Sequence, residues 1–302
     1  MESRQKLTVG GVAKRILRTS LLVYFVILIV LTFLQRQLLY HPRKADALRV
    51  AQFEDVTRLF PNSTDVELVC SDGITIRGWL LQKHARSDAQ NSGRPLVLFF
   101  HGNAGNRAGR TGWYRLLESS GTDVLAVDYH GYGDSEGKMS EGSLQRACDA
   151  TWSYAITELG YAPSEILIAG SSLGGAAAVY TAAEACASGD APAGLAVVAT
   201  FSSMTEVAGS LYPWLPVGAV LVDRYPSAER ISGITSRIVV MHGDQDTLVR
   251  PQFGRKLFDA APDTSSDGTP KKWISLDGTG HNDILSSAGH IIQPAIEELL
   301  QP

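Results

Sequence analysis

Residues 19–35 carry no charged side chain, and residues 21–31 are almost wholly apolar. Arg18 and Arg36 bound this stretch. Its length is close to that needed to cross a hydrocarbon core of about 30 Å, and flanking arginines extend it by reaching toward the surface. A cleaved signal peptide would need small residues after the apolar core, and none lies at a cleavage spacing. The pattern therefore predicts an uncleaved single-pass anchor over residues 19–37, preceded by a basic segment, residues 1–18.

Basic residues lie on both sides of the predicted anchor. Five precede it and four follow it, namely Arg4, Lys6, Lys14, Arg15, Arg18, Arg36, Arg43, Lys44 and Arg49. The positive-inside bias favours a cytoplasmic N-terminus, with the remaining chain on the opposite side of the membrane. Residues 38–63 have mixed polarity and are expected to form a connector, with Tyr40 as an aromatic residue at the membrane interface.

Two short alternating runs, residues 66–70 and 74–81, flank a Ser-Asp-Gly turn and predict an antiparallel hairpin. Continuous apolar runs then follow, as expected of strands buried on both faces. They cover residues 96–100, 124–127, 166–169, 195–198, 238–241 and 273–276. Helical stretches separate them, at residues 107–119, 141–159, 173–187, 251–261 and 283–300. This alternation predicts a mainly parallel sheet with right-handed crossovers.

One connection is longer than a crossover requires. About 35 residues separate Phe201 from Ser236, and they include an apolar, proline-broken stretch. We expect an insertion at residues 203–232 that forms a small cap over the strand ends. An ordinary packing helix with a kinked start is the alternative.

Composition narrows the class of protein. The 302 residues suffice for one large α/β domain with a small extra element. A net charge of −4 argues against a nucleic-acid binder, which would show a basic face. The three cysteines, Cys70, Cys148 and Cys186, have no metal-ligand spacing, so we expect them to be small core residues and predict no metal site.

The candidate chemistry begins where the predicted strand 166–169 meets the predicted helix 173–187. The intervening residues 170–174 are Gly-Ser-Ser-Leu-Gly, the pattern G-x-S-x-G. Small residues two positions before and after Ser172 permit a sharp turn that exposes its hydroxyl at a helix N-terminus. A glycine-rich turn with incidental serines would show the same pattern, so the other strand ends decide between them.

Three further strand ends supply the other groups that serine catalysis requires. The backbone N–H groups of Asn103, in a His-Gly-Asn-Ala-Gly-Asn loop, and of Leu173 are candidate oxyanion donors. Asp244 and Asp246 follow another strand, and spacing alone does not separate them as the acid. His281 follows the last strand and is the candidate base.

Three more histidines, His101, His130 and His242, also follow predicted strands, and a structural role holding loops is favoured for each. His290 lies within the last predicted helix and is expected at its surface.

In combination these motifs resemble the α/β-hydrolase superfamily from about residue 66 to the C-terminus. The order Ser…Asp…His is that family's order, and Tyr129-His130-Gly131-Tyr132-Gly133-Asp134-Ser135 also falls in its place. The resemblance is closest to single-pass hydrolase-domain proteins with a minimal cap, a group that includes protein depalmitoylases and lipid acyl hydrolases. It implies an α/β-hydrolase domain over residues 64–302, with a mostly parallel eight-stranded sheet, helices on both faces and a short cap. It also implies that Asp246, rather than Asp244, is the acid.

The expected function is a membrane-anchored serine hydrolase of acyl esters or thioesters, with a Ser172–Asp246–His281 triad. Known depalmitoylases often have a cysteine-rich lipidated N-terminus, which this chain lacks. A serine peptidase of the same fold and a non-enzymatic binding protein are the alternatives. The apolar cap residues Tyr212, Trp214, Leu215 and Val217 are candidate pocket residues. We expect no metal or organic cofactor, and a small-molecule or lipid acyl substrate and the membrane as partners.

Overall fold

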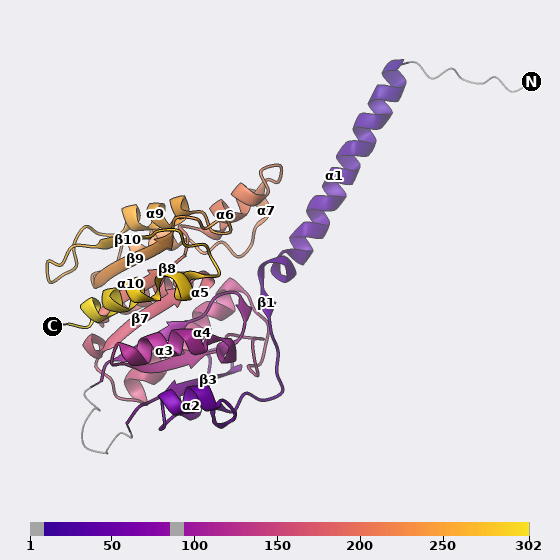
Figure 1. Cartoon of the computed structure of the whole chain (residues 1–302). Helices are drawn as coiled ribbons and strands as arrows, with labels where there is room; N and C mark the ends of the chain where they lie inside the picture. Colours follow the sequence, from indigo (N-terminus) through magenta and orange to yellow (C-terminus); the bar gives the residue numbers. More distant parts are fainter. Residues whose placement is uncertain (1–8, 85–93, 302) are drawn as a thin grey trace, which may run out of the picture.

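A long N-terminal helix, α1 (Val9–Leu39), projects away from a layered α/β domain in the computed structural model (Figure 1). The structure describes residues 9–84 and 94–301; the first part of the basic segment, with Arg4 and Lys6, and most of a polar loop after the hairpin lie outside that range. The apolar window of α1 has a mean hydropathy of 2.4 and none of it is buried in the protein. The helix therefore has the length and composition to cross a membrane, and it extends beyond both ends of the predicted anchor.

Within the described residues, eight strands form the central sheet in the order β10-β9-β8-β7-β4-β6-β3-β2. The strands are β2 (Thr64–Val69), β3 (Thr75–Leu81), β4 (Leu96–Phe100), β6 (Asp123–Val127), β7 (Ile166–Ser171), β8 (Gly194–Val198), β9 (Arg237–Gly243) and β10 (Lys272–Leu276). All neighbouring pairs are parallel except β2 with β3 and β3 with β6. The predicted hairpin and the mostly parallel sheet are confirmed.

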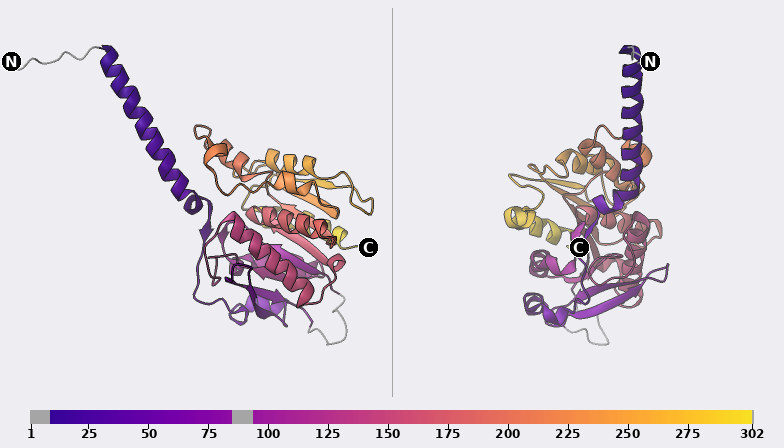
Figure 2. Two further views of the ribbon diagram at one scale, coloured as in Figure 1. Left: turned by 180° about the vertical axis from the view of Figure 1, so that it is seen from behind. Right: turned by 90° about the vertical axis from the view of Figure 1, so that its right-hand side faces the viewer.

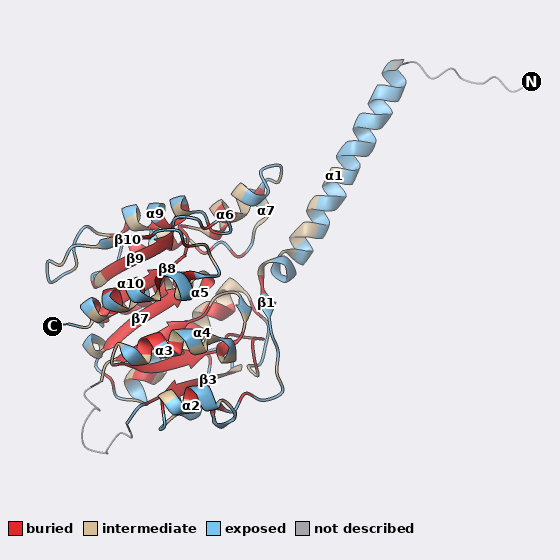
Figure 3. Ribbon diagram, viewed as in Figure 1, coloured by how far each residue is buried: buried red, intermediate tan, exposed pale blue. Residues whose placement is uncertain are grey.

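Both faces of the sheet are buried, as the continuous apolar runs require. In β4, Leu96, Leu98 and Phe100 face one core cluster, whereas Val97 and Phe99 face the other. The first face is covered by α4 (Glu141–Thr157), α5 (Leu173–Ala187), α8 (Ser227–Ile231) and α9 (Pro251–Ala260). The second is covered by α2 (Glu54–Leu59), α3 (Thr111–Ser119) and α10 (Ile284–Leu299). Figure 3 shows the buried strands between these partly exposed helices.

The insertion between β8 and β9 contains α6 (Met204–Leu211), α7 (Val217–Val220) and α8. The first two are short and extend from the domain toward α1 (Figure 2). Helix α8 instead packs on α5, within the main core. Three short 3-10 helices, η1 (Val50–Gln52), η2 (Arg107–Arg110) and η3 (Pro163–Glu165), complete the described helices.

The connector is more structured than predicted, because its backbone pairs with the domain. Strand β1 (His41–Pro42) pairs in parallel with β5 (Ala104–Gly105). The prediction that Tyr40 lies at the membrane interface is wrong, since its side chain is only 5% exposed. Its hydroxyl is 3.0 Å from Asp223 Oδ2 and 2.6 Å from the Tyr225 hydroxyl, so polar partners inside the domain hold it there.

The cysteine prediction is confirmed for two of the three residues. Cys70 and Cys148 are buried in the core, whereas Cys186 is half-buried, and all three are free thiols.

Candidate active site

Ser172 occupies a strained turn between β7 and α5. Its φ of 56° and ψ of −122° lie where residues with a side chain rarely go. A Cβ at Gly170 would overlap the Gly174 carbonyl, and a Cβ at Gly174 would overlap the Phe100 carbonyl. Ser172 N–H donates to the Val198 carbonyl at 2.9 Å, and its own carbonyl accepts from the Thr200 hydroxyl at 2.9 Å. The glycines thus permit the turn, and backbone hydrogen bonds hold it.

Three side chains that are distant in sequence meet at the carboxyl ends of the strands. His281 Nε2 lies 3.1 Å from Ser172 Oγ. His281 Nδ1 lies 2.6 Å from Asp246 Oδ2. These distances allow hydrogen bonds along the whole chain of atoms. The arrangement can move a proton from a hydroxyl to an imidazole while a carboxylate fixes the imidazole's orientation.

The geometry distinguishes the two candidate aspartates. Asp246 is buried, and its Oδ1 accepts from the Leu248 and Val249 N–H groups at 2.9 and 2.8 Å. Burial alone would raise the pKa of Asp246, but hydrogen bonds from His242 and His281 outweigh it and hold that pKa well below its usual range. Asp244 is exposed at the start of the same loop. Asp246 is therefore the ionised carboxylate beside His281.

The Gly102–Asn103 backbone lies beside the serine. A Cβ at Gly102 would be 3.5 Å from Ser172 Cβ, an ordinary contact. Leu173 is the first residue of α5, so its N–H has no acceptor within the helix. The two predicted oxyanion donors therefore lie on the two segments that flank Ser172.

Tyrosines from the predicted Tyr129–Ser135 motif hold the loop that carries Asn103. The Tyr129 hydroxyl donates to the His101 carbonyl at 2.7 Å, and the Tyr132 hydroxyl donates to the Asn103 carbonyl at 2.6 Å. The Asn103 side chain donates to the Leu39 carbonyl, at the end of α1, at 2.7 Å. The loop is thus held from the domain and from α1 together.

A buried ion cluster below this loop was missed by sequence reasoning. Arg107 is 1% exposed, and its Nη1 lies 2.6 Å from Asp128 and 2.7 Å from Asp134. His101 Nε2 lies 3.0 Å from the same Asp128 carboxylate. Arg107 directly follows the His-Gly-Asn-Ala-Gly-Asn loop, and this position was the only feature of the sequence that pointed to a role for it near the site. A buried arginine requires such acids, because an unpaired charge in the core is costly.

The structural role expected for three histidines agrees with their burial. His101, His130 and His242 are 2%, 1% and 0% exposed. His242 Nε2 lies 2.7 Å from the Val249 carbonyl and 3.4 Å from Asp246 Oδ2. The buried imidazole therefore contacts the loop that carries Asp246 at two positions. A Cβ at Gly254 would overlap His242 Nδ1, so α9 needs a glycine there. His290 is exposed on α10, as predicted.

The four candidate pocket residues have different surroundings. Tyr212 and Trp214 are 46% and 54% exposed, whereas Val217 is buried and Leu215 is intermediate. The Trp214 carbonyl accepts a hydrogen bond from Tyr24 of α1, so this part of the insertion lies against the N-terminal helix. A pocket formed by these residues stays a prediction.

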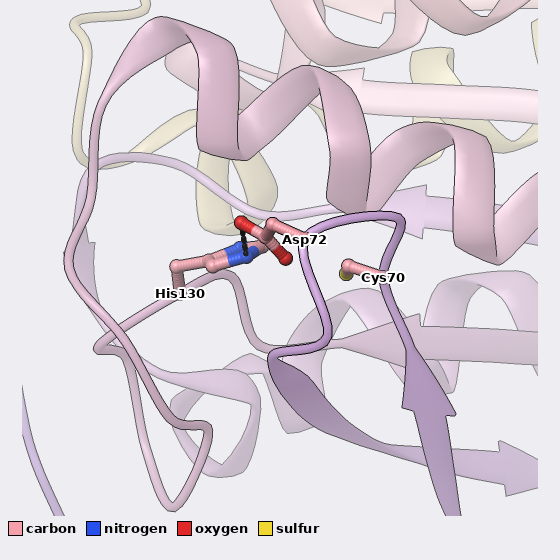
Figure 4. Close-up of side chains that lie close together, drawn as sticks. All are labelled: Cys70, Asp72 and His130. Atoms are coloured by element: carbon pink, nitrogen blue, oxygen red, sulfur yellow. Dashed lines mark ion pairs between the residues drawn. The ribbon is translucent and has the colours of Figure 1, made fainter.

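One further group has side chains of the kinds that bind metals. Ligand atoms of Cys70, Asp72 and His130 lie within 4.8 Å of one another, at the β2–β3 turn (Figure 4). However, Arg146 Nε lies 2.7 Å from Asp72 Oδ2, so a guanidinium already neutralises the only carboxylate. Burial also raises the pKa of the Cys70 thiol to about 11, which opposes the thiolate that a metal needs. The group ties the hairpin turn to α4, and its charges disfavour a bound cation.

Comparison with known proteins agrees with this fold. Residues 95–224 match the family described as the alpha/beta hydrolase fold. The uncharacterized protein MT2364 of Mycobacterium tuberculosis is 31% identical over 274 residues, which cover 90% of each chain. Lysophosphatidylserine lipase ABHD12 of Danio rerio is 33% identical over 190 residues, covering 58% of this chain and 49% of that protein. The chain belongs to the α/β-hydrolase superfamily.

Solved structures show the same architecture at low sequence identity. The Pyrococcus furiosus esterase Pf2001 aligns with a TM-score of 0.62 and 16% identity, covering 86% of this chain and 98% of that chain. This likeness confirms the fold, and the family match and the 31% identical relative confirm the superfamily inferred from the motifs. Esterases and lipases among these similar proteins support a hydrolase.

Proposed function

We propose that this chain is a membrane-anchored serine hydrolase that cleaves acyl esters or thioesters through an acyl-enzyme. The observation that carries the proposal is the continuous contact from Ser172 Oγ to His281 to Asp246, at 3.1 and 2.6 Å. Ser172 also has the backbone strain typical of a nucleophile on a strand-to-helix turn.

Each group has a defined task in this mechanism. Ser172 attacks the acyl carbonyl while His281 Nε2 takes its proton, and His281 then protonates the leaving alcohol or thiol. Asp246 holds the imidazole with its proton on Nδ1 and stabilises the imidazolium. Water repeats the sequence on the acyl-enzyme and releases the carboxylic acid and free Ser172.

Backbone N–H groups of Asn103 and Leu173 would bind the oxyanion of each tetrahedral intermediate. The N-terminal end of α5 adds the positive end of its dipole at the same place. Fixed donors of this kind are effective because they do not reorient as charge develops. No metal or organic cofactor takes part in these steps.

A lipid acyl ester is the substrate class that the surroundings favour. The apolar insertion with Tyr212, Trp214, Leu215 and Val217 offers contacts for an acyl chain. A lysophosphatidylserine lipase among the relatives supports the same class. Helix α1 would hold the enzyme at the membrane in which such substrates reside. The small excess of basic residues before the uncharged stretch, residues 19–35, favours a cytoplasmic N-terminus and a catalytic domain on the opposite side.

Labelling with a fluorescent fluorophosphonate tests the nucleophile directly. We expect the purified full chain to be labelled, and expect Ser172→Ala and His281→Ala to lose the label. Ser171→Ala is the matched control, because it removes the neighbouring hydroxyl of the same Gly-Ser-Ser-Leu-Gly turn. Equal labelling of wild type and Ser172→Ala would refute the mechanism.

Substrate profiling then separates the remaining alternatives. We expect hydrolysis of p-nitrophenyl esters or acyl thioesters, with a dependence on chain length. Faster cleavage of peptides than of esters would indicate a peptidase of the same fold. Absence of both labelling and turnover would indicate a binding protein.

A further inference from the structure

Exposed large apolar side chains outside α1 are concentrated in the insertion. Among the described residues, six such side chains lie outside α1, namely Val69, Leu211, Tyr212, Trp214, Val222 and Leu248. Four of the six fall within residues 211–222, here called the cap tip. A cluster of this kind on a protein surface usually contacts another apolar phase.

The cap tip belongs to a second uncharged stretch. Residues 207–222 contain no charged side chain, and Glu206 and Asp223 bound them. The uncharged stretch of α1 ends at Arg36. Arg36 Nε lies 2.9 Å from Asp223 Oδ2, so the charge that ends one stretch pairs with the charge that ends the other. The C-terminal ends of the two uncharged stretches therefore lie beside each other.

Hydrogen bonds hold the cap tip against the part of α1 that precedes Arg36. The Gln35 side chain donates to the Val220 carbonyl at 3.3 Å and accepts from the Val222 N–H at 2.8 Å. The Tyr24 hydroxyl donates to the Trp214 carbonyl at 2.9 Å. Tyr24 lies just over three helical turns before Arg36, about 18 Å along the helix axis. The views from behind and from the side show the cap tip beside the lower part of α1 (Figure 2).

The backbone of the cap tip is suited to an environment without water. Pro213 and Pro216 have no N–H group to satisfy. Leu215 N–H donates to the Tyr212 carbonyl at 3.0 Å, and Leu221 N–H donates to the Val217 carbonyl at 2.9 Å. Non-helical backbone in hydrocarbon requires partners of this kind from the protein. Tyr24 and Gln35 of α1 supply partners for the Trp214 carbonyl, the Val220 carbonyl and the Val222 N–H.

We propose that the cap tip, residues 211–222, inserts into the same leaflet as the C-terminal part of α1 and makes a second contact with the lipid acyl chains. The inference rests on the proposed membrane anchoring by α1. The bilayer is the occupant because the cap tip lies against the apolar part of α1 and its own residues, 211–222, include no charged side chain. The catalytic domain would then be held at a fixed depth and angle, with its insertion open to lipid acyl chains rather than to bulk water.

Site-specific fluorescence in vesicles tests the depth of the cap tip. Full-length Ser172→Ala, Cys186→Ala protein is reconstituted in phosphatidylcholine vesicles, and single cysteines replace Leu211, Trp214, Phe33 or Val69 in turn. Cys70 and Cys148 are buried and remain. Each new thiol carries an environment-sensitive nitrobenzoxadiazole dye. Quenching is measured with lipids that carry a nitroxide on one acyl chain and with aqueous iodide.

Phe33 and Val69 are the matched controls, because they are 81% and 71% exposed. Phe33 lies on α1, whereas Val69 lies on β2, at the edge of the sheet opposite β10. We expect positions 33, 211 and 214 to be quenched several-fold more by the lipid nitroxide than position 69, and position 69 to be the most sensitive to iodide. The label at Leu211 repeats the measurement without disturbing Trp214.

Two results would overturn the inference. One is iodide quenching at positions 211 and 214 equal to that at position 69. The other is protection from iodide without lipid quenching, which a second copy or a protein partner would give. If either result is found while position 33 is quenched by the lipid nitroxide, the insertion of the cap tip is refuted and the anchoring by α1 stands. If position 33 is not quenched by the lipid nitroxide, the anchoring by α1 is refuted as well. The Ser172→Ala background makes the outcome independent of catalysis.

Discussion

Replacing Asp246 by asparagine probes the proposed mechanism most sharply, because the structure dictates how the amide must lie. Asp246 Oδ1 accepts from two backbone N–H groups, of Leu248 and Val249, at 2.9 and 2.8 Å. The asparagine carbonyl oxygen must take that position, since an NH₂ group would face two donors. The NH₂ group then points at His281 Nδ1, where the carboxylate oxygen lies 2.6 Å away.

That orientation reverses the tautomer of His281. The amide donates to Nδ1, so the neutral imidazole carries its proton on Nε2, the atom that lies 3.1 Å from Ser172 Oγ. Such an imidazole cannot accept the serine proton. In serine proteases the same exchange lowers kcat by about 10⁴. We expect a loss of that order here, or roughly 5 kcal/mol of transition-state stabilisation at about 1.4 kcal/mol per factor of ten.

Steady-state hydrolysis of a short p-nitrophenyl ester measures kcat and KM for this variant. Asp244→Asn is the matched control, because it removes the same charge from an exposed position of the same loop. We expect Asp244→Asn to retain activity within a few-fold of wild type. A kcat for Asp246→Asn within ten-fold of wild type would refute the assignment, as would an equal loss in both variants.

Three other substitutions test the supports of the site. Asn103→Ser keeps the backbone N–H but removes the 2.7 Å hydrogen bond to the Leu39 carbonyl. We expect kcat to fall about five-fold, which corresponds to about 1 kcal/mol. An unchanged kcat would contradict the role of that hydrogen bond. Gly254→Ala places a Cβ in contact with the His242 ring, so we expect about 1–3 kcal/mol of destabilisation, measured as a lower Tm. An unchanged Tm would show that α9 shifts away from His242 at no cost in stability. Burial lowers the pKa of His130 in the folded protein, so folding favours the neutral imidazole. The stability that the neutral imidazole contributes to the fold is present in full above about pH 6.5, the pKa of an unfolded histidine, and is lost as the pH falls toward the lower pKa of the folded state. His130→Asn should therefore lose less Tm than wild type between about pH 7.5 and about pH 5.5, and an equal loss would contradict this reasoning.

Most of the central sheet was predictable because its strands are buried on both faces. The predicted run 96–100 coincides with β4, and the predicted helix 173–187 coincides with α5. The connector was less predictable, because β1 has two residues and its pairing with β5 joins segments some sixty residues apart. Tyr40 illustrates the cause. A tyrosine after an apolar helix favours a membrane interface, and only the distant Asp223 and Tyr225 make burial stable.

The three residues of the proposed triad were predictable for a different reason. Gly170 and Gly174 are required by close backbone contacts beside Ser172, and Gly278 near His281 has a positive φ, so these glycines leave a local pattern. Arg107 leaves no such pattern, since a buried arginine is defined by the acids that tertiary structure brings to it. The choice between Asp244 and Asp246 likewise depended on the family resemblance until the 2.6 Å contact with His281 was visible.

Asn103 links the proposed oxyanion site to helix α1. Its side chain binds the last carbonyl of α1, and its backbone carbonyl accepts from His41 N–H at 3.1 Å and from the Tyr132 hydroxyl. Removing α1 would leave the Asn103 amide without that acceptor and Asp223 without Arg36, while Tyr132 still held the loop. A chain beginning after Leu39 should therefore lose kcat toward a soluble ester as well as membrane binding. A helix that served only as a tether would change neither kcat nor KM for a substrate that never enters the bilayer.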